Sequence, residues 1–368
     1  MKIGVPREIK RHEYRVGLTP ASVKAYVKNG HEVFVEKGAG IGSGYEDSEY
    51  EVHGARILAD KAQLFRQSEM IVKVKEPLPE EYALFHEDQI LYTYLHLAAN
   101  KELAEQLMKR KVTGVAYETI ELPDRSLPCL TPMSEIAGRL SIQEGAKYLE
   151  KAFGGRGILL GGVPGVQRGK VAILGGGVVG TNACKIAVGI GATVTVLDIN
   201  AKRLAYLDDI FGSSITTLYA TEANVEMVLR ESDIVVGAVL VTGETAPRLI
   251  TRQHLSIMQP GAVIVDVAID QGGCAETSKP TTHDDPIYIV DGIVHYCVAN
   301  MPGAVARSST IALTSVTLQY GLQIAGQGIK AAARASEPLR KGINTIGGAC
   351  VHPGVAKSCG LPYTEYAV

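Results

Sequence analysis

A glycine-rich turn between a strand and a helix constrains the fold of this chain more than any other feature. The segment VAILGGGVVG places Gly175, Gly177 and Gly180 in the spacing GxGxxG, after an apolar strand and before the helix-forming TNACKIAVGIG. In such turns the first glycine permits a tight bend, the second lets the backbone approach a pyrophosphate, and the third allows close helix packing. The amides at the start of the helix then hold the phosphates. The segment therefore predicts a dinucleotide site at the edge of a parallel sheet.

A carboxylate at the end of the next strand indicates the type of dinucleotide. The strand TVTVLD ends in Asp198, 18 residues beyond Gly180, where an acidic side chain accepts hydrogen bonds from the adenosine ribose. Because Asp198 would repel a 2′-phosphate, NAD is favoured over NADP. Lys202 and Arg203 follow closely and argue for a phosphate, although a basic residue there also suits the face of the adenine. We expect NAD, with Arg203 among the residues that bind it.

The rest of the chain alternates short β-branched runs with segments of helical length, which is typical of parallel sheets covered by helices on both faces. Strands are predicted in the first third at 2–5, 31–36, 70–75, 90–95 and 113–120, and long helices at 131–153, with Thr131 as N-cap, and at about 304–326. The predicted class is α/β, with two doubly wound domains. A Rossmann NAD-binding domain (131–305) is inserted into a discontinuous, flavodoxin-like substrate domain (1–130 plus 306–368), on which the tail packs back.

Length and composition limit the classes of partner. At 368 residues and 46% hydrophobic content, the chain is long enough to bury two cores. Its 37 basic and 39 acidic residues leave a net charge of -2, so neither nucleic acid nor an anionic membrane is expected as a partner. The six cysteines form no CxxC pair, and no His, Asp and Glu cluster has metal-ligand spacing, so we expect no disulfide and no metal. Without a signal-peptide core or a membrane-length apolar run, the protein is expected to be cytoplasmic.

Four chemically capable side chains lie at the ends of predicted strands. Arg15 is in the loop after KIGV, Lys75 ends MIVKVK, His96 follows ILYTYL, and Asp270 follows AVIVDVAI. Each has an ordinary structural explanation, such as a solvated lysine or an aspartate that caps a turn. Ligands of open parallel sheets, however, bind outside the carboxyl ends of the strands. Two cations, an imidazole and a carboxylate suit a substrate with a carboxylate and an amine or carbonyl, and the domain plan puts Asp270 across a cleft from the other three.

Several segments together resemble a known family. They are PREIKRHEYRVGLTP (6–20), YLHLA (94–98), TPMSE (131–135), VAILGGGVVGTNAC (171–184) and HYCVANMPGAVARSST (295–310). Over nearly the whole chain they are similar to the alanine dehydrogenase and pyridine nucleotide transhydrogenase family. The resemblance implies NAD-dependent oxidative deamination of L-alanine to pyruvate and ammonia, the reverse amination, and a homo-hexamer. In the opening segment we expect Arg15 to face inward, and Arg7, Lys10 and Arg11 to face solvent or other loops.

The resemblance also assigns roles to residues. Arg15 would pair with the substrate carboxylate, and Lys75 would reach that carboxylate or the carbonyl oxygen. His96 would be the acid/base group, and Asp270 would manage the water or ammonia that adds to and leaves the imine carbon. Some family members carry Ser where this chain has Ala220, so no side-chain contact is assigned there. On the cofactor side the pattern falls on Ser134, Gly175, Gly177, Val178, Val179, Gly180, Asp198, Arg203, Val239, Leu240, Val267, Ala268, Ile269, Asp270, Lys279, Val298, Ala299, Asn300 and Met301.

Other functions stay open at this point. The nearest is the nucleotide-binding component of a proton-translocating transhydrogenase, which shares the opening segment and passes hydride between two nicotinamides. A non-catalytic NAD sensor would leave the four strand-end residues without a role. Saccharopine dehydrogenases share the two-domain plan and act on a bulky dicarboxylate adduct. The sequence also leaves open the selectivity among alanine, serine, glycine and 2-aminobutyrate.

Overall fold

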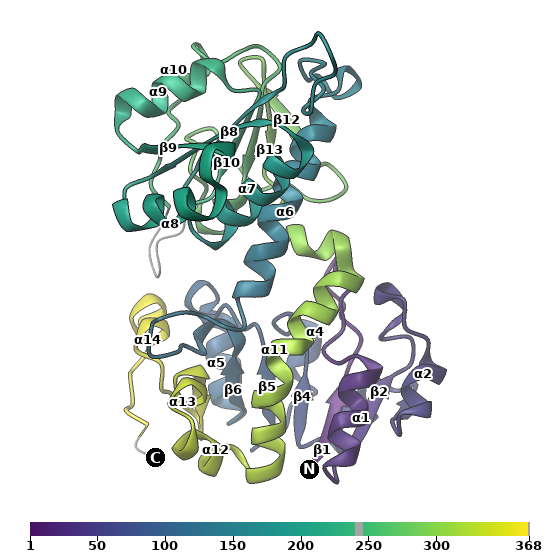
Figure 1. Ribbon diagram of the computed structural model, residues 1–368. Coiled ribbons are helices and arrows are strands. Elements are labelled where there is room, and N and C mark those ends of the chain that lie inside the picture. The colour runs from purple at the N-terminus through teal and green to yellow at the C-terminus, as the bar shows by residue number, and fades with distance from the viewer. Residues whose placement is uncertain (240–245, 367–368) are drawn as a thin grey trace. The chain divides into compact units, whose positions relative to one another are not determined.

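The chain is known from a computed structural model that describes residues 1–239 and 246–366. They form two compact units (Figure 1). Unit 1 comprises Met1–Met133 and Gly303–Val368, and unit 2 comprises Ser134–Pro302. Within the described part of the chain, no helix combines the length and apolar character needed to cross a lipid bilayer.

Unit 1 is built on a sheet whose central strands are parallel. The strand order is β15-β14-β6-β5-β4-β1-β2-β3. Reading from β3 to β6, this is the doubly wound order 3-2-1-4-5-6. A flavodoxin-like sheet has the order 2-1-3-4-5. Leaving out the edge strand β3 and renumbering the rest gives that order, so the predicted winding is present with one additional edge strand. The tail closes the other side, since β14 pairs antiparallel with β6 as expected for a segment that packs back. The strands are β1 (Lys2–Val5), β2 (Glu32–Glu36), β3 (Arg56–Leu58), β4 (Met70–Val72), β5 (Ile90–Thr93), β6 (Thr113–Ala116), β14 (Ile343–Ile346) and β15 (Ala349–Cys350).

Helices cover both faces of this sheet, because successive strand residues point to opposite sides. Leu91 of β5 belongs to the core under α3, α5 and α14, whereas the next residue, Tyr92, donates its hydroxyl to Thr317 O of α11 at 2.9 Å. Local signals start these helices: Thr19 caps α1 and Asn100 caps α5. The helices are α1 (Pro20–Lys28), α2 (Asp47–Val52), α3 (Lys61–Gln67), α4 (Pro79–Tyr82), α5 (Lys101–Lys109), α11 (Ala306–Gln327), α12 (Ile329–Ala335), α13 (Glu337–Gly342) and α14 (Pro353–Cys359).

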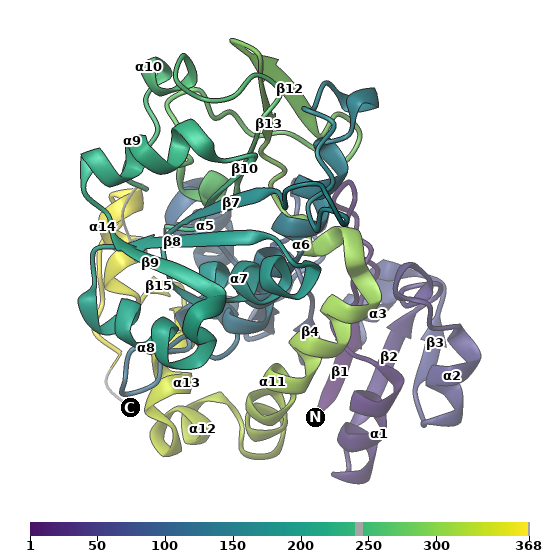
Figure 2. The ribbon, with the colours of Figure 1, turned by 45° about the horizontal axis from the view of Figure 1, so that its top comes forward.

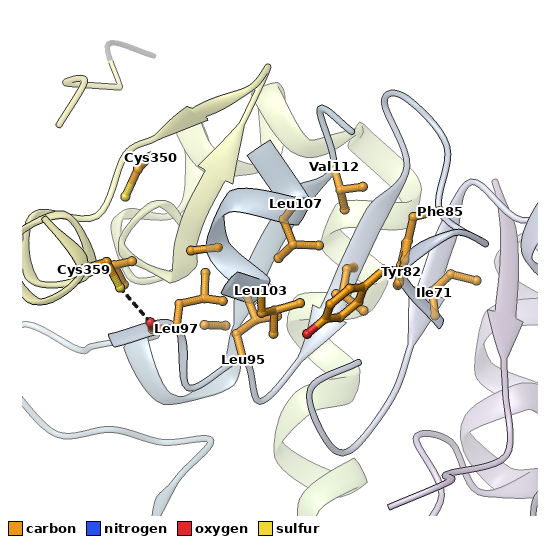
Figure 3. Packing of buried hydrophobic residues seen from close by; sticks show 14 of the residues in the cluster. Ile71, Tyr82, Phe85, Leu95, Leu97, Leu103, Leu107, Val112, Cys350 and Cys359 are labelled. Atoms are coloured by element: carbon orange, nitrogen blue, oxygen red, sulfur yellow. Dashed lines mark hydrogen bonds between the residues drawn. The ribbon is translucent and has the colours of Figure 1, made fainter. Parts of the chain in front are cut away.

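The apolar core of unit 1 joins segments that are far apart in sequence (Figure 3). Phe85 packs edge-on against Phe65 of α3, with ring centroids 5.0 Å apart. From the tail, Cys359 enters the same cluster and its thiol donates to Leu97 O at 3.1 Å. Burying a Val, Leu or Phe side chain contributes about 1.5–3 kcal/mol to stability. Because the tail also adds Val355 to this cluster, it is integral to unit 1.

Unit 2 is a second doubly wound sheet, in the order β12-β13-β11-β10-β7-β8-β9. Its strands are parallel except β12, which pairs antiparallel with β13. Helices α7 and α8 pack on β7, β8 and β9 (Figure 2). The strands are β7 (Lys170–Leu174), β8 (Thr193–Asp198), β9 (Ile215–Tyr219), β10 (Ile234–Gly237), β11 (Val263–Asp266), β12 (Ile287–Val290) and β13 (Ile293–Tyr296), and the helices are α6 (Thr131–Tyr148), which begins in unit 1, α7 (Val178–Ile190), α8 (Ala201–Phe211), α9 (Glu222–Glu231) and α10 (Arg252–Leu255).

Several predicted elements end earlier than their apolar patterns. The strand predicted at 70–75 stops at Val72, and the one at 90–95 stops at Thr93. The helix predicted at 131–153 ends at Tyr148, before a 3-10 turn at Lys151–Phe153. Thr131 was expected to cap this helix, but it is the first helical residue and its hydroxyl donates to Leu127 O at 3.0 Å. Backbone pairing continues briefly beyond both strand ends, since Lys73 N donates to Tyr92 O at 3.1 Å and Tyr94 N donates to Val74 O at 3.3 Å.

An unsatisfied hydroxyl in the core of unit 1 gives a test of this packing. Tyr26 is fully buried, and among the described residues its hydroxyl has no hydrogen-bond partner. Because a buried unpaired hydroxyl costs about 1–3 kcal/mol, Tyr26→Phe should raise the free energy of unfolding by about 1 kcal/mol. Tyr92→Phe is the matched control and should lower it by a similar amount, since that hydroxyl donates to Thr317 O. Thermal unfolding midpoints measure both, and a lower midpoint for Tyr26→Phe would contradict the assignment.

Candidate active site

The carboxyl ends of β1, β4, β5 and β6 carry a cluster of charged side chains in unit 1. Chain order reverses between β1 and β4, because β2 and β3 continue on one side and β5 and β6 on the other. Such a switch point is where open α/β sheets bind ligands. Arg15 follows β1, Lys75 follows β4 and His96 follows β5. The three first-domain residues singled out in the sequence therefore follow three neighbouring strands.

Arg15 faces inward, as predicted, and is held by Glu13. Its side chain is 2% exposed, and its Nε and Nη2 donate to the two Glu13 carboxylate oxygens at 2.6 Å each. Nη1 lies 3.0 Å from Met133 Sδ. Burial by itself would lower the pKa of Arg15, but the hydrogen bonds and charge of Glu13 outweigh it and raise that pKa. The guanidinium is thus charged and fixed in plane. Arg7 and Arg11 are exposed, as expected.

A buried ion network shapes the segment that carries Lys75. The Lys73 ammonium is completely buried, 3.1 Å from carboxylate oxygens of both Glu8 and Glu81. The other oxygen of Glu8 accepts the backbone amides of Val74 at 2.6 Å and Lys75 at 3.4 Å. Burial disfavours the charged ammonium, yet the two carboxylates outweigh it and raise the pKa of Lys73. One residue of the opening segment therefore fixes the chain directly before Lys75.

Lys75 itself is half-buried and has an altered acidity. Within the described residues its ammonium has no ion-pair partner. Burial lowers the pKa of Lys75, and the nearby Arg15 cation lowers it further, against the opposing effects of Glu76 and Glu13. A lysine whose pKa is lowered by desolvation and by a nearby like charge is a candidate functional residue.

His96 is held at the mouth of the same strand ends. Its backbone has φ +49°, in the left-handed region that few non-glycine residues adopt, and its amide donates to Glu118 Oε1 at 2.6 Å. The imidazole stacks on the Tyr94 ring with centroids 5.8 Å apart, and its Nδ1 lies 3.2 Å from Glu76 Oε2. Its side chain remains 45% exposed, so the ring is accessible as well as oriented.

A pocket of about 570 Å³ opens beside this cluster. It is lined by most of residues 7–15 and by a loop that includes Gly38 and Gly42. Glu13 and Arg15 reach its wall, whereas Lys75 and His96 are outside the lining. The opening segment therefore forms a concave surface that leads to the buried guanidinium.

The glycine turn of unit 2 is tightly packed at two of its glycines and open at the third. Gly175 has φ +102°, and a Cβ on Gly180 would lie 1.8 Å from Gly175 O, so neither position suits another residue. Gly177 is the N-cap of α7 and makes no side-chain capping bond, and a Cβ there would meet nothing within 4 Å. The uncapped start of α7 and the space beside Gly177 are compatible with an anion at this helix N-terminus.

The remaining predicted cofactor residues also gather at strand ends. In unit 2 the order reverses between β7 and β10, and Val239 follows β10, Val267–Asp270 follow β11, and Val298–Met301 follow β13. Ser134 lies on α6, and the exposed Lys279 stacks its ammonium 4.4 Å from the centroid of the Tyr288 ring. Leu240 lies outside the described residues.

Asp198 and Arg203 are both tied to the glycine turn. One oxygen of Asp198 accepts Gly176 N at 2.7 Å and the other accepts Asn200 N at 2.8 Å, which leaves further lone pairs for ribose hydroxyls. The Arg203 guanidinium donates to Gly176 O and to Thr181 Oγ1. The Arg203 side chain is directed toward the glycine turn, because its Nε and Nη2 already donate to Gly176 O and Thr181 Oγ1. It is therefore not extended toward the position of a 2′-phosphate.

Asp270 is exposed in the 3-10 turn η6 (Val267–Gln271), and Asp266 holds that turn in shape. The buried Asp266 carboxylate accepts Ala268 N at 3.1 Å, Cys274 N at 2.8 Å and Ser278 Oγ at 2.5 Å. Among the residues that the structure describes, no group of three His, Cys, Asp or Glu side chains is placed to hold a metal ion.

Sequence reasoning missed the residues that support this chemistry. Glu13, Glu76, Glu118 and Asp266 each hold a predicted functional residue or its loop, and Tyr94 stacks on one. One of these had a local signal, since Glu13 is two positions before Arg15, whereas Glu76 meets His96 across 20 residues. Glu118 had none, because its contact with His96 spans 22 residues.

Two doubly wound sheets, each with candidate site residues after the strands at its switch point, define a two-unit α/β protein with a Rossmann-like second unit. Models of the alanine dehydrogenase/PNT family match the chain, the N-terminal domain over residues 4–137 and the C-terminal domain over 141–353. The chain belongs to this family.

Individual proteins agree with that membership. The chain is 58% identical to an alanine dehydrogenase of Methanococcus maripaludis, covering 99% of this chain and 98% of that protein. It is 56% identical, with the same coverage, to one of Geobacillus stearothermophilus. A solved L-alanine dehydrogenase superposes with a TM-score of 0.95 at 55% identity, covering 97% of this chain and 99% of that one. A transhydrogenase from Sinorhizobium meliloti gives 0.82 at 26% identity, covering 96% and 99%.

The close approach at the glycine turn predicts a large effect of one methyl group. In Gly180→Ala the new Cβ would overlap Gly175 O, and backbone cannot move aside cheaply, so we expect a loss of at least about 2 kcal/mol in stability. Gly189→Ala in the same helix is the control. Its Cβ would meet nothing within 4 Å, so it should be neutral or stabilise by up to about 1 kcal/mol. Thermal unfolding compares them, and equal midpoints would disprove the close packing.

Proposed function

We propose that this chain catalyses the reversible, NAD-dependent oxidative deamination of L-alanine. The balanced reaction is L-alanine + NAD⁺ + H₂O → pyruvate + NH₄⁺ + NADH + H⁺. The observation that carries the proposal is the grouping of Arg15, Lys75 and His96 after neighbouring strands at the switch point of unit 1. The full-length similarity to alanine dehydrogenases supports the same reaction. In this proposal unit 1 binds the substrate and unit 2 binds the cofactor. They correspond to the domains predicted from the sequence at 1–130 plus 306–368 and at 131–305.

Two cations would recognise the substrate carboxylate. Glu13 fixes the plane of the Arg15 guanidinium through Nε and Nη2, which presets the direction of its other donor hydrogens. The lowered pKa of Lys75, caused by burial and by Arg15, makes its ammonium a stronger hydrogen-bond donor to the carboxylate or to the carbonyl oxygen of pyruvate. A small amino acid bound here is held by charge and has its α-carbon near the strand ends.

His96 and Asp270 are the proposed catalytic residues. Loss of hydride from the α-carbon of alanine gives an iminium, which water attacks, and the resulting carbinolamine collapses to pyruvate and ammonia. These later steps each move a proton, and an imidazole exchanges protons readily near neutral pH. His96 would take the proton from the attacking water and return it to the leaving amine. The Asp270 carboxylate would orient that water or the ammonia of the reverse reaction.

NAD is the cofactor we propose for unit 2, and it supplies hydride acceptance at its nicotinamide when bound. The residues present fit it. The open space at Gly177 and the uncapped start of α7 suit a pyrophosphate, and the Asp198 carboxylate suits ribose hydroxyls while repelling a 2′-phosphate. Arg203 would stabilise the glycine turn through its hydrogen bonds to Gly176 O and Thr181 Oγ1. The family resemblance further supports a homo-hexamer that acts in the cytoplasm, with L-alanine, pyruvate and ammonia as its partners.

The reaction is tested directly by following NADH absorbance. Purified protein should form NADH from NAD and L-alanine, and consume it with pyruvate and ammonia. His96→Ala and Asp270→Asn should each lower kcat at least about 100-fold, since acid–base groups contribute about 10²–10⁴-fold. His53→Ala and Asp209→Asn are matched controls away from the strand ends and should retain activity. If the wild type binds NADH but is silent in both directions, amino-acid chemistry is excluded and hydride exchange between nicotinamides is tested next.

Gly177 separates cofactor binding from folding. In Gly177→Ala the added methyl group touches nothing in the protein, so the unfolding midpoint should not change. It would occupy the space proposed for the pyrophosphate and should weaken NADH binding at least about 10-fold. NADH fluorescence titration measures this, with Gly189→Ala as the control. Unchanged affinity in Gly177→Ala would refute the proposed phosphate position.

A further inference from the structure

We propose that Glu76 is a positioning residue for His96, which fixes the imidazole in the tautomer with hydrogen on Nδ1 and leaves Nε2 to exchange protons with the substrate. This inference rests on the proposed function, because it specifies how the acid/base group of that reaction is prepared. A carboxylate paired with one ring nitrogen determines which nitrogen of a histidine is available for chemistry.

The fold brings the two side chains together from neighbouring strands. Glu76 lies four residues after β4 ends, and His96 lies three residues after β5 ends, and these strands are adjacent and parallel. Their side chains meet with Glu76 Oε2 3.2 Å from His96 Nδ1. The Glu118 contact to the His96 amide and the stack on Tyr94 fix the remaining freedom of the ring. Glu76 is therefore one of three restraints, and the one that contacts a ring nitrogen.

The protonation state of Glu76 decides the direction of this hydrogen bond. Its side chain is only 11% exposed, and its second oxygen pairs with Lys10 Nζ of the opening segment. Burial alone would raise the pKa of Glu76, but the hydrogen bond and charge of His96, together with Lys10, hold it well below its usual range. An ionised carboxylate only accepts hydrogen bonds. Nδ1 must then be the donor, and Nε2 of the neutral ring is the acceptor.

The charges around this contact give the two neighbouring residues opposite expected effects on the ring. Among the residues that the structure describes, the charged and titratable groups around His96 are Glu76, which contacts Nδ1, Lys10, which pairs with Glu76, Glu118 at the backbone amide, Tyr94 against the ring, and Lys75 next to Glu76 in the chain. Removing the Glu76 charge would favour the neutral ring. Removing the Lys10 charge would have the opposite effect, since Glu76 would then act on the ring without its counter-ion.

These opposite signs give the test, which is the pH dependence of kcat/KM for L-alanine in the full-length protein. Glu76→Gln keeps the size of the side chain but can present an amide donor to Nδ1, so kcat should fall about 10- to 100-fold, as for other orienting partners of histidine. The acidic limb of its profile should move to lower pH, because a negative charge beside the ring has been removed. In Lys10→Met the limb should move to higher pH. Glu80→Gln, an exposed neighbour, is the control and should change nothing.

The outcomes separate this inference from the proposed function. An inactive wild type overturns the function, whereas an active wild type with an inactive His96→Ala and an unaltered Glu76→Gln overturns the positioning role alone. Shifts of the same sign in Glu76→Gln and Lys10→Met also overturn it, because they indicate general damage to the loop. We expect Glu76→Gln to keep the wild-type NADH affinity and unfolding midpoint. We also expect the acidic limb to move to lower pH in Glu76→Gln and to higher pH in Lys10→Met.

Discussion

The ion network around Lys73 is the interaction on which unit 1 depends. An ammonium without access to water is tolerated only when carboxylates surround it, and here Glu8 and Glu81 supply them. Because Glu8 belongs to the opening segment and also accepts the amides of Val74 and Lys75, the network ties the loop after β1 to the loop after β4. Those two loops flank the switch point. The fully buried Lys73 ammonium therefore determines the shape of the proposed substrate site, although it is not exposed to that site.

Carboxylates recur throughout this edge of the sheet as supports for positive or titratable groups. Glu13 orients Arg15, Glu76 contacts His96 at Nδ1, and Glu118 holds the strained His96 backbone. The same logic is found in unit 2, where Asp198 fixes the glycine turn and Asp266 fixes the turn that bears Asp270. The predicted functional residues Arg15, His96 and Asp270 thus lie on segments whose course is determined by a buried or half-buried acid, rather than by regular secondary structure.

The sequence predicts the parts of this arrangement that depend on local or periodic patterns. Apolar runs located β1, β2, β5 and β6, and the glycine spacing located the turn before α7. The polar residues that follow strands identified Arg15, Lys75 and His96 because parallel strands align their carboxyl ends at one edge. Patterns were uninformative where the decisive partner is distant. Strand β3 has only three residues, which is too short for an alternating apolar pattern to be recognised. The contact of Glu8 with the Val74 amide spans 66 positions, so no local pattern predicts it. Strand ends were also placed too late, because Val74 and Tyr94 continue the apolar pattern beyond Val72 and Thr93, where the strands end.

The pairing of β14 with β6 has a consequence for how the chain is made. Gly114 N donates to Thr345 Oγ1 across 231 positions, and all of unit 2 lies between these strands. During synthesis β6 therefore emerges with a bare edge, which is a surface that recruits other strands, and it waits while the contiguous unit 2 is translated and can fold first. Because non-local pairings also form slowly, the nascent chain is most vulnerable to misassociation between the appearance of β6 and the arrival of the tail.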